Sequence, residues 1–117
     1  MNTKPRPPIV CLCGSSKFPD EHILATMRET LLGKIVLPLG LYGHADFPKG
    51  AKFVTKEAED ILPVRQMLDR LQLQKIEMAD EIFVVNPIRY FGPQTRIEIE
   101  YAQARGKRIR FLCSPAV

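Results

Sequence analysis

The chain has 117 residues, 45% of them hydrophobic and 26% charged, with a net charge of +4. This length suits one domain with a single core, and the composition is that of an ordinary globular protein. No apolar run approaches the ~20 residues of a membrane span, so we expect no membrane contact. Three cysteines, an odd number, disfavour a disulfide framework. With no evident signal peptide, we expect a cytoplasmic protein.

Apolar runs alternate with helical patterns along the chain, which predicts an α/β fold. Residues 1–7 predict a flexible N-terminal tail and residues 8–117 a single domain. Strands are expected at 9–13, 34–39, 81–85 and 108–112, and helices at 19–32, 63–79 and 93–105. This order predicts a small doubly wound, Rossmann- or flavodoxin-like three-layer sandwich with four to five parallel strands. Residues 44–62 have no clear pattern, and we expect a lid or binding loop there.

The helical patterns also predict which faces are buried. In the first helix, Ile23, Met27 and Leu31 recur every four residues, which predicts that they face the core. His22, in the first turn of that helix, is expected to be solvated. The second helix is apolar over a broad arc, which indicates deep burial or contact with a second subunit. We therefore expect a homo-oligomer, a dimer or larger.

Two cysteines lie within the first predicted strand. Cys11 and Cys13 are two residues apart, so they share one face and suit buried thiols. Their spacing, without a second ligand pair, does not indicate a zinc site, and we expect no metal. The densest basic cluster, at residues 105–110, has no interleaved aromatic residues of the kind that stack on bases. We expect a solvated surface there and no nucleic acid partner.

The turn Gly14-Ser15-Ser16 follows the first predicted strand and precedes a helix. Backbone amides and two hydroxyls at a helix N-terminus can cradle an anion. An ordinary turn, in which a serine caps the helix, has the same pattern. The spacing leaves both readings open, since it matches neither a Walker loop nor a dinucleotide fingerprint.

Thr95 and Glu98 lie just after the third predicted strand. In an open α/β sheet, ligands bind outside the carboxyl ends of the strands, which places Glu98 near such a site. The pair also matches a capping box, in which each side chain bonds the other's backbone amide. From these residues alone, the capping box is the favoured reading.

A resemblance to known enzymes bears on the Gly14-Ser15-Ser16 turn and on the Thr95–Glu98 pair. VCLCGSS, at 10–16, resembles the first strand and turn of the 2'-deoxynucleoside 5'-phosphate N-hydrolases and the "lonely guy" cytokinin riboside phosphate phosphoribohydrolases. MADEIFVVN, at 78–86, and GPQTRIEIEYAQARGKRI, at 92–109, are similar to the strand, loop and helix of the nucleoside 2-deoxyribosyltransferases. Glu98 matches the nucleophilic glutamate of those families. The resemblance does not extend through residues 44–62.

The resemblance implies a nucleoside or nucleotide ligand and chemistry at the N-glycosidic bond, either hydrolysis or transfer. Glu98 would attack the anomeric carbon of the sugar, and no cofactor would be needed. The residues that would bind the substrate are Gly14, Ser15, Ser16, Asn86 and Thr95.

The chain departs from the family pattern where a partner acid is expected. Gln72 stands at the position of the aspartate that helps the leaving base, and an amide cannot donate a proton as an acid. Asp69 is the candidate acid on the same helix, and His44 and Asp46 are alternatives in the predicted loop. Glu100 stands where the family usually has glycine.

Three functions therefore stay open on the sequence alone. The first is an enzyme that acts at the N-glycosidic bond. The second is a catalytically inactive nucleotide sensor or binding module of the same fold. The third is a homo-oligomeric scaffold in which Thr95 and Glu98 only cap their helix.

Overall fold

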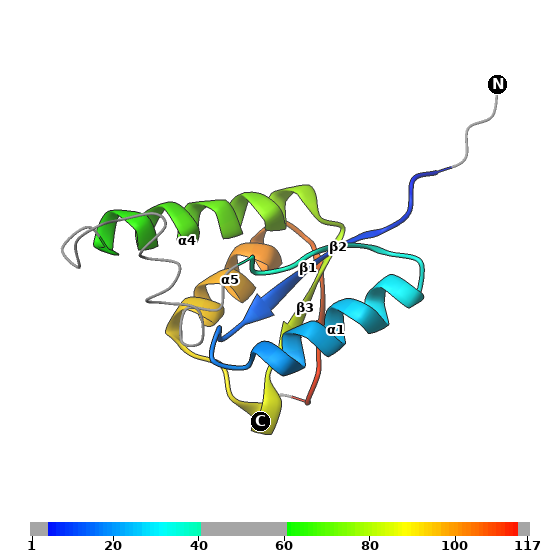
Figure 1. Cartoon of the computed structure of the whole chain (residues 1–117). Helices are drawn as coiled ribbons and strands as arrows, with labels where there is room; N and C mark the ends of the chain where they lie inside the picture. Colours follow the sequence, from blue (N-terminus) through cyan, green and yellow to red (C-terminus); the bar gives the residue numbers. More distant parts are fainter. Residues whose placement is uncertain (1–4, 41–60, 115–117) are drawn as a thin grey trace.

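A computed structural model describes residues 5–40 and 61–114 of the chain (Figure 1). Its elements in order are β1 (Ile9–Gly14), α1 (Pro19–Leu31), β2 (Ile35–Leu37), α4 (Ile61–Met78), β3 (Glu81–Val85), the short 3-10 helix η2 (Pro87–Arg89), α5 (Pro93–Ala104) and β4 (Arg108–Phe111). The predicted lid lies outside the described residues, apart from 61 and 62, which belong to α4. None of the helices described is long and apolar enough to cross a membrane.

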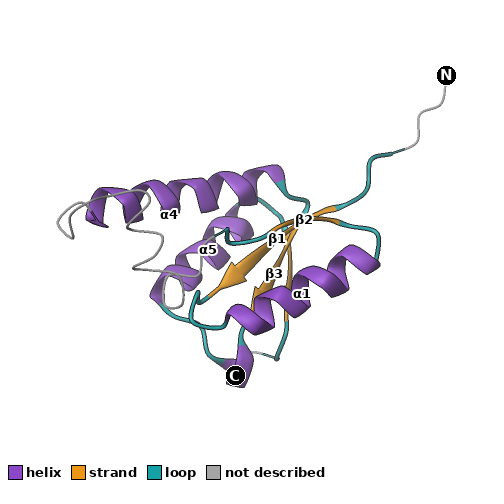
Figure 2. Cartoon of the chain, viewed as in Figure 1, coloured by secondary structure: helices purple, strands orange, loops and turns teal. Residues whose placement is uncertain are grey.

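The strands form one parallel sheet of four strands in the order β2-β1-β3-β4. Helices α4 and α5 cover one face of this sheet, and α1 covers the other (Figure 2). The predicted doubly wound α/β sandwich is thereby confirmed. The strand order reverses between β1 and β3, and such a switch point is where ligands bind in open α/β sheets.

The core lies on both faces of the two central strands. All five residues of β3 are buried, as a strand covered on both sides should be. Cys11 and Cys13 point toward α4 and α5 as free, buried thiols, which confirms the prediction for them. On the other face, Leu12 and Phe83 belong to the cluster that packs under α1.

Helix α1 packs with the opposite face from the one predicted. Its buried residues are His22, Ala25 and Glu29. Ile23, Met27 and Leu31 are instead 49%, 56% and 87% exposed. The prediction that these three face the core was wrong, as was the expectation that His22 is solvated. The physical reason is that Glu29 has two partly buried cationic partners beneath the helix, so a charged residue occupies a core-facing position.

These partners belong to an ion cluster of four residues that joins α1 to the sheet. Glu29 and Glu81 are 1% and 6% exposed. Lys34 Nζ lies 3.2 Å from Glu29 and 3.1 Å from Glu81, and Arg110 pairs with both carboxylates. Burial opposes ionisation, but the two cations outweigh it and lower the pKa of both acids. Arg110, expected in a solvated basic surface, is half-buried here.

A second ion pair attaches residues that were predicted as a free tail. Arg6 donates two hydrogen bonds to Asp80, at 2.7 and 2.9 Å, just before β3. Asp80 also accepts a bond from the backbone amide of Ile9. The Arg6 guanidinium holds the pKa of the Asp80 carboxyl well below its usual range. The chain is thus fastened beside the amino end of β1.

Candidate functional site

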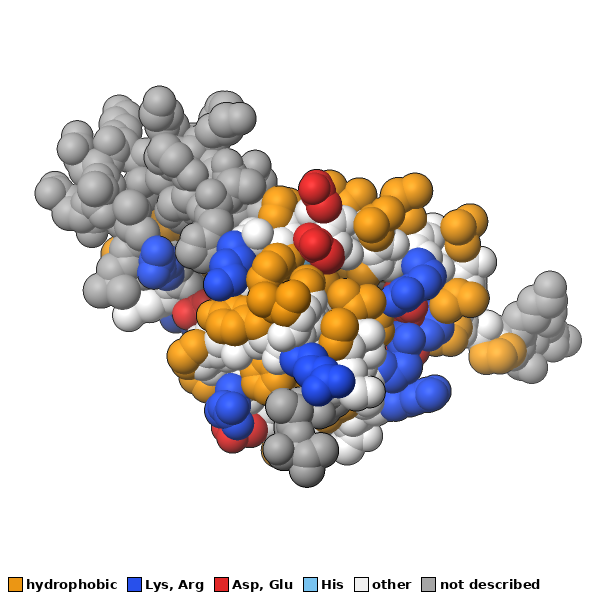
Figure 3. All heavy atoms as spheres, turned by 90° about the horizontal axis from the view of Figure 1, so that it is seen from below, with side chains coloured by type: hydrophobic (Ala, Val, Ile, Leu, Met, Phe, Trp, Pro, Cys, Tyr) orange, Lys and Arg blue, Asp and Glu red, His pale blue; other side chains and the backbone are white. Residues whose placement is uncertain are grey.

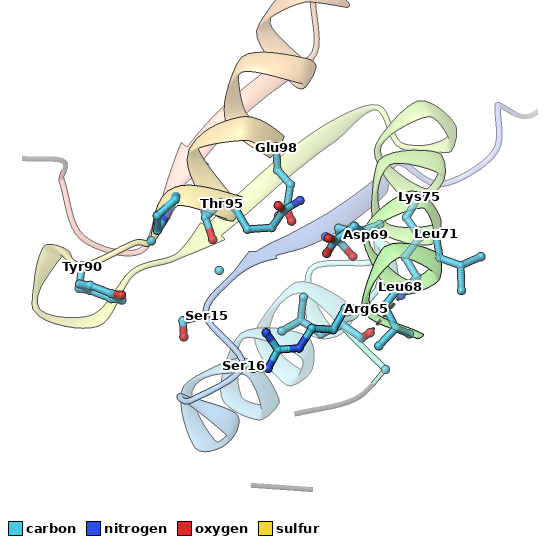
Figure 4. A pocket seen from close by; sticks show the side chains of 17 residues that line it. Ser15, Ser16, Arg65, Leu68, Asp69, Leu71, Lys75, Tyr90, Thr95 and Glu98 are labelled. Atoms are coloured by element: carbon cyan, nitrogen blue, oxygen red, sulfur yellow. Dashed lines mark hydrogen bonds between the residues drawn. The ribbon is translucent and has the colours of Figure 1, made fainter. Parts of the chain in front are cut away.

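A pocket of about 710 Å³ opens at the carboxyl ends of the central strands, between α4 and α5 (Figure 4). It lies at the switch point of the sheet. Its described lining residues are Gly14, Ser15, Ser16, Leu39, Gly40, Arg65, Leu68, Asp69, Leu71, Gln72, Lys75, Tyr90, Gly92, Pro93, Gln94, Thr95 and Glu98. The pocket therefore brings together the predicted turn, the Thr95–Glu98 pair and the candidate acid Asp69.

Glu98 reaches this pocket because α5 starts earlier than a capping box would require. The N-cap residue is Gly92 and makes no side-chain cap bond, with Pro93 at the first helical position. Proline favours that position because its fixed φ suits a helix start and its missing N–H leaves no donor unsatisfied. Thr95 is thus already inside the first turn, and Glu98 lies a turn further on, directed into the pocket (Figure 4). The capping-box prediction was wrong.

The Glu98 carboxyl is buried, with 6% of the residue exposed. Its Oε1 has no hydrogen-bond partner within residues 5–40 and 61–114. Burial raises the pKa of Glu98 to about 7, with a smaller contribution from the charge of Asp69, whereas Cys13, Gln94 and Lys75 act in the opposite direction. An unsatisfied buried polar atom costs about 1–3 kcal/mol. A buried carboxyl with a raised pKa in a cleft is typical of functional positions.

The opposite wall of the pocket is one face of α4. Arg65, Asp69, Gln72 and Lys75 follow one another at intervals of three or four residues, so they share that face. Asp69 is exposed, and it lies across the pocket from Glu98 (Figure 4). Arg65 and Lys75 were not predicted as site residues, although both lie on the same helical face as Asp69 and could have been found by counting turns from it.

Two α4 side chains fix this wall in place. Lys75 Nζ donates to the carbonyls of Pro38 and Leu39, at 2.7 and 3.2 Å, which ties α4 to the segment after β2. Gln72 donates to the carbonyl of Leu12 at 2.9 Å, and its Nε2 lies 3.6 Å from the Cys13 sulfur. The amide at the family's acid position is therefore engaged with β1.

The Gly14-Ser15-Ser16 turn forms the floor of the pocket beside Val85. Gly14 has a φ of +138°, and a Cβ there would lie 2.5 Å from the Val85 carbonyl oxygen, so only glycine fits. His22 lies behind the turn, where burial lowers its pKa and a hydrogen bond to the Ser15 backbone acts in the opposite direction. The N-cap of α1 is Phe18, without a side-chain cap bond. Neither serine is thus the N-cap residue of α1.

The loop after β3 places Tyr90 at the rim. Ile88 and Arg89 have φ of 52° and 60°, a left-handed conformation that β-branched residues rarely adopt. Lys17 Nζ lies 4.0 Å from the centroid of the Tyr90 ring, which also packs edge-on against Phe18. An aromatic ring and a cation therefore border the opening. No sequence pattern pointed to Tyr90, beyond its place after the third predicted strand.

Asn86 does not line the pocket, although the resemblance implied that it would. It is fully buried, and its amide exchanges two hydrogen bonds of 2.9 Å with the backbone of Cys113. Asn86 therefore holds the segment after β4 against the end of β3.

No group of three or more His, Cys, Asp or Glu side chains that could hold a metal occurs in the part of the chain described. No protein-family model, curated protein or solved structure matches the chain. The pocket and the sequence resemblance are therefore the two observations that bear on function.

Proposed function

We propose that the protein binds a nucleoside or nucleotide in this pocket and cleaves or transfers it at the N-glycosidic bond, with Glu98 as the nucleophile. One observation carries the proposal: the buried Glu98 carboxyl has an oxygen without a partner in the described structure, beside an open cavity. The motifs at 10–16 and 92–109 support the substrate class, because both contribute residues to that cavity.

In the proposed reaction, Oε1 of Glu98 forms a bond to the anomeric carbon while the bond to the base breaks. The electron pair leaves with the base, which takes up a proton. Water then completes hydrolysis, or a second base completes transfer, and Glu98 is regenerated. A carboxylate suits this role because it stabilises an oxocarbenium-like transition state and can form the covalent intermediate.

Asp69 is our candidate for the acid that assists the leaving base. It is the only carboxylate besides Glu98 among the described lining residues, and it comes from the opposite wall. Ser15, Ser16 and Thr95 offer hydroxyls for the sugar or a 5'-phosphate, and Arg65 offers a positive charge. General acid catalysis of this kind typically contributes about 10²–10⁴-fold.

A second candidate, a nucleotide-binding module without turnover, is favoured by Gln72. This side chain occupies the family's acid position, cannot donate a proton as an acid, and is bonded to β1. In that case the same pocket would bind the ligand, and Glu98 would contribute to recognition alone.

The test is release of free base from a panel of nucleosides and nucleoside monophosphates, with binding measured by calorimetry. We expect release by wild type, none by Glu98→Gln with binding retained, and a loss of about 10²–10⁴-fold for Asp69→Asn. Glu100→Gln is the matched control, because Glu100 is exposed on the same helix. Binding without release by wild type would favour the binding module. Absence of both would refute the two candidates together.

A further inference from the structure

A buried histidine of helix α1 packs against the backbone of the Gly14-Ser15-Ser16 turn. His22 is fully buried, and the face of the molecule drawn in Figure 3 shows no histidine side chain among the described residues. Its Nε2 would lie 3.3 Å from a Cβ built at Gly14, so the ring touches the turn directly. Burying a polar ring costs free energy unless the ring is hydrogen-bonded. The reaction proposed for the pocket gives this side chain no role.

The imidazole of His22 donates a hydrogen bond to the turn. Burial lowers the pKa of His22, so the ring is neutral at pH 7 and carries one N–H. Its bond to the Ser15 backbone favours the protonated ring, as a bond donated by the ring does. The acceptor is therefore the Ser15 carbonyl, which also accepts from the Phe18 amide at 3.3 Å. Both donors lie on the α1 side of the turn.

The direction of the Ser15 carbonyl determines where the next amide points. In a trans peptide, the C=O and N–H bonds point to opposite sides. With the carbonyl held toward α1, the Ser16 amide points away from that helix, to the side where both serines line the pocket (Figure 4). Neither the amide nor the hydroxyl of Ser16 is hydrogen-bonded to another described residue. The turn therefore offers hydrogen-bond donors to the pocket.

We propose that His22 is a positioning residue, which holds the Ser15–Ser16 peptide with its N–H toward the pocket so that the turn binds oxygen atoms of the ligand. These oxygens belong to the sugar or to a phosphate. This role rests on the proposed function, since the ligand is the one bound in that pocket. If the peptide turned over, the Ser15 carbonyl would face the pocket and repel the same oxygens.

Three variants separate this role from general support of the fold. His22→Leu removes the donor, and His22→Gln restores one, because a glutamine amide places an N–H near the position of Nε2. Ala25→Gly is the matched control: Ala25 is buried on the same face of α1, and glycine weakens the helix without removing a donor from the turn. Circular dichroism verifies folding, and His22→Asn, with a shorter amide, replaces His22→Leu if that variant does not fold.

Amide hydrogen exchange in the free protein tests the contact without a ligand. The Phe18 amide of His22→Leu should exchange about tenfold faster than that of wild type, because its acceptor carbonyl is no longer held. His22→Gln should keep most of the protection, and Ala25→Gly should show no selective loss at Phe18. Unchanged exchange of Phe18 in a folded variant without the donor would overturn the proposal.

Base release and calorimetry with the panel of nucleosides and nucleoside monophosphates test the consequence for the ligand. For His22→Leu we expect KM to rise about tenfold, near the contribution of one hydrogen bond, with kcat almost unchanged because the turn binds ground and transition states alike. His22→Gln should be close to wild type. An effect confined to the monophosphates identifies a phosphate oxygen as the bound group, and an equal effect on nucleosides identifies a sugar oxygen.

The outcomes distinguish this inference from the proposed function. A wild-type KM in the variant without the donor would overturn the role of His22 and leave the proposed function standing. If wild type binds no member of the panel, the proposed function fails instead. In that case the exchange of the Phe18 amide still decides whether His22 holds the turn.

Discussion

At the scale of single residues, Glu98 lowers stability as the pH rises. Its pKa is about 7 in the folded chain, against 4.5 for an ordinary glutamate. The folded state therefore holds the proton more tightly than the unfolded state. The loss of stability caused by the buried Glu98 charge is absent below the unfolded-state pKa of 4.5. It grows as the pH rises through the folded-state pKa of about 7. At 1.36 kcal/mol per pKa unit, the difference amounts to about 3 kcal/mol at alkaline pH.

We predict that Glu98→Gln stabilises the protein at pH 8 by up to about 3 kcal/mol, because it removes the buried charge without changing the shape. At pH 4 the variant and wild type should have nearly equal stability. Urea unfolding at the two pH values measures this. A variant less stable at pH 8 by about 0.5–2 kcal/mol, the usual loss of a helix cap, would restore the capping reading.

Ile88 is a second residue whose backbone opposes stability. It is 85% exposed, so its side chain gains little from burial, and its positive φ costs about 1–2 kcal/mol in an L-residue. We predict that Ile88→Asn stabilises the protein by about 1 kcal/mol, since asparagine tolerates this conformation. Ile97→Asn is the control within helix α5 and should not stabilise. Thermal unfolding compares them, and a lower midpoint for Ile88→Asn would contradict the strain argument.

At the scale of elements, the ion cluster of Glu29, Lys34, Glu81 and Arg110 joins α1, the segment after it, β3 and β4. We predict that Arg110→Met destabilises the protein by about 3–5 kcal/mol at pH 7, because two buried carboxylates then share one cation. Arg105→Met breaks the exposed pair with Glu77 and should lose at most about 1 kcal/mol.

The pH dependence of the Arg110 variant follows from the lowered pKa values of Glu29 and Glu81. The cluster stabilises the fold above the unfolded pKa of 4.5, and this stabilisation is lost as pH falls through the lower folded values. The difference between wild type and Arg110→Met should therefore shrink on acidification. Denaturant midpoints at pH 7 and pH 3 measure it, and a difference that grows in acid would contradict this account.

The strands and helix ends could be predicted from sequence because local physics determines them. Buried parallel strands read as continuous apolar runs, and Gly33 and Gly106 end α1 and α5 with positive φ. The packing face of α1 could not be predicted, because the burial of Glu29 depends on Arg110, a partner 81 residues away in sequence. Periodicity treats such a charge as solvent-facing.

At the scale of the whole molecule, the doubly wound topology explains which part of the site was predictable. It gathers the carboxyl ends of β1 and β3, and so brings the Gly14 turn, Thr95 and Glu98 to one pocket. The place of Asp69 in the pocket could also be predicted, because α4 packs beside the same ends of the strands. The positions of Tyr90 and Asn86 could not be predicted in this way. A loop conformation determines where Tyr90 lies, and a contact with the C-terminal segment determines where Asn86 lies. The resemblance to nucleoside-processing enzymes remains a prediction that base release will test.

The distribution of the three cysteines has a practical consequence. Cys11 and Cys13 are buried, whereas Cys113 is partly exposed and bonded through its backbone to Asn86 at the end of β3. A thiol-reactive fluorophore should therefore label the native chain at Cys113, beside the sheet edge that forms the pocket. The native sequence thus offers an attachment point for a spectroscopic reporter of ligand binding, with no cysteine to add or remove.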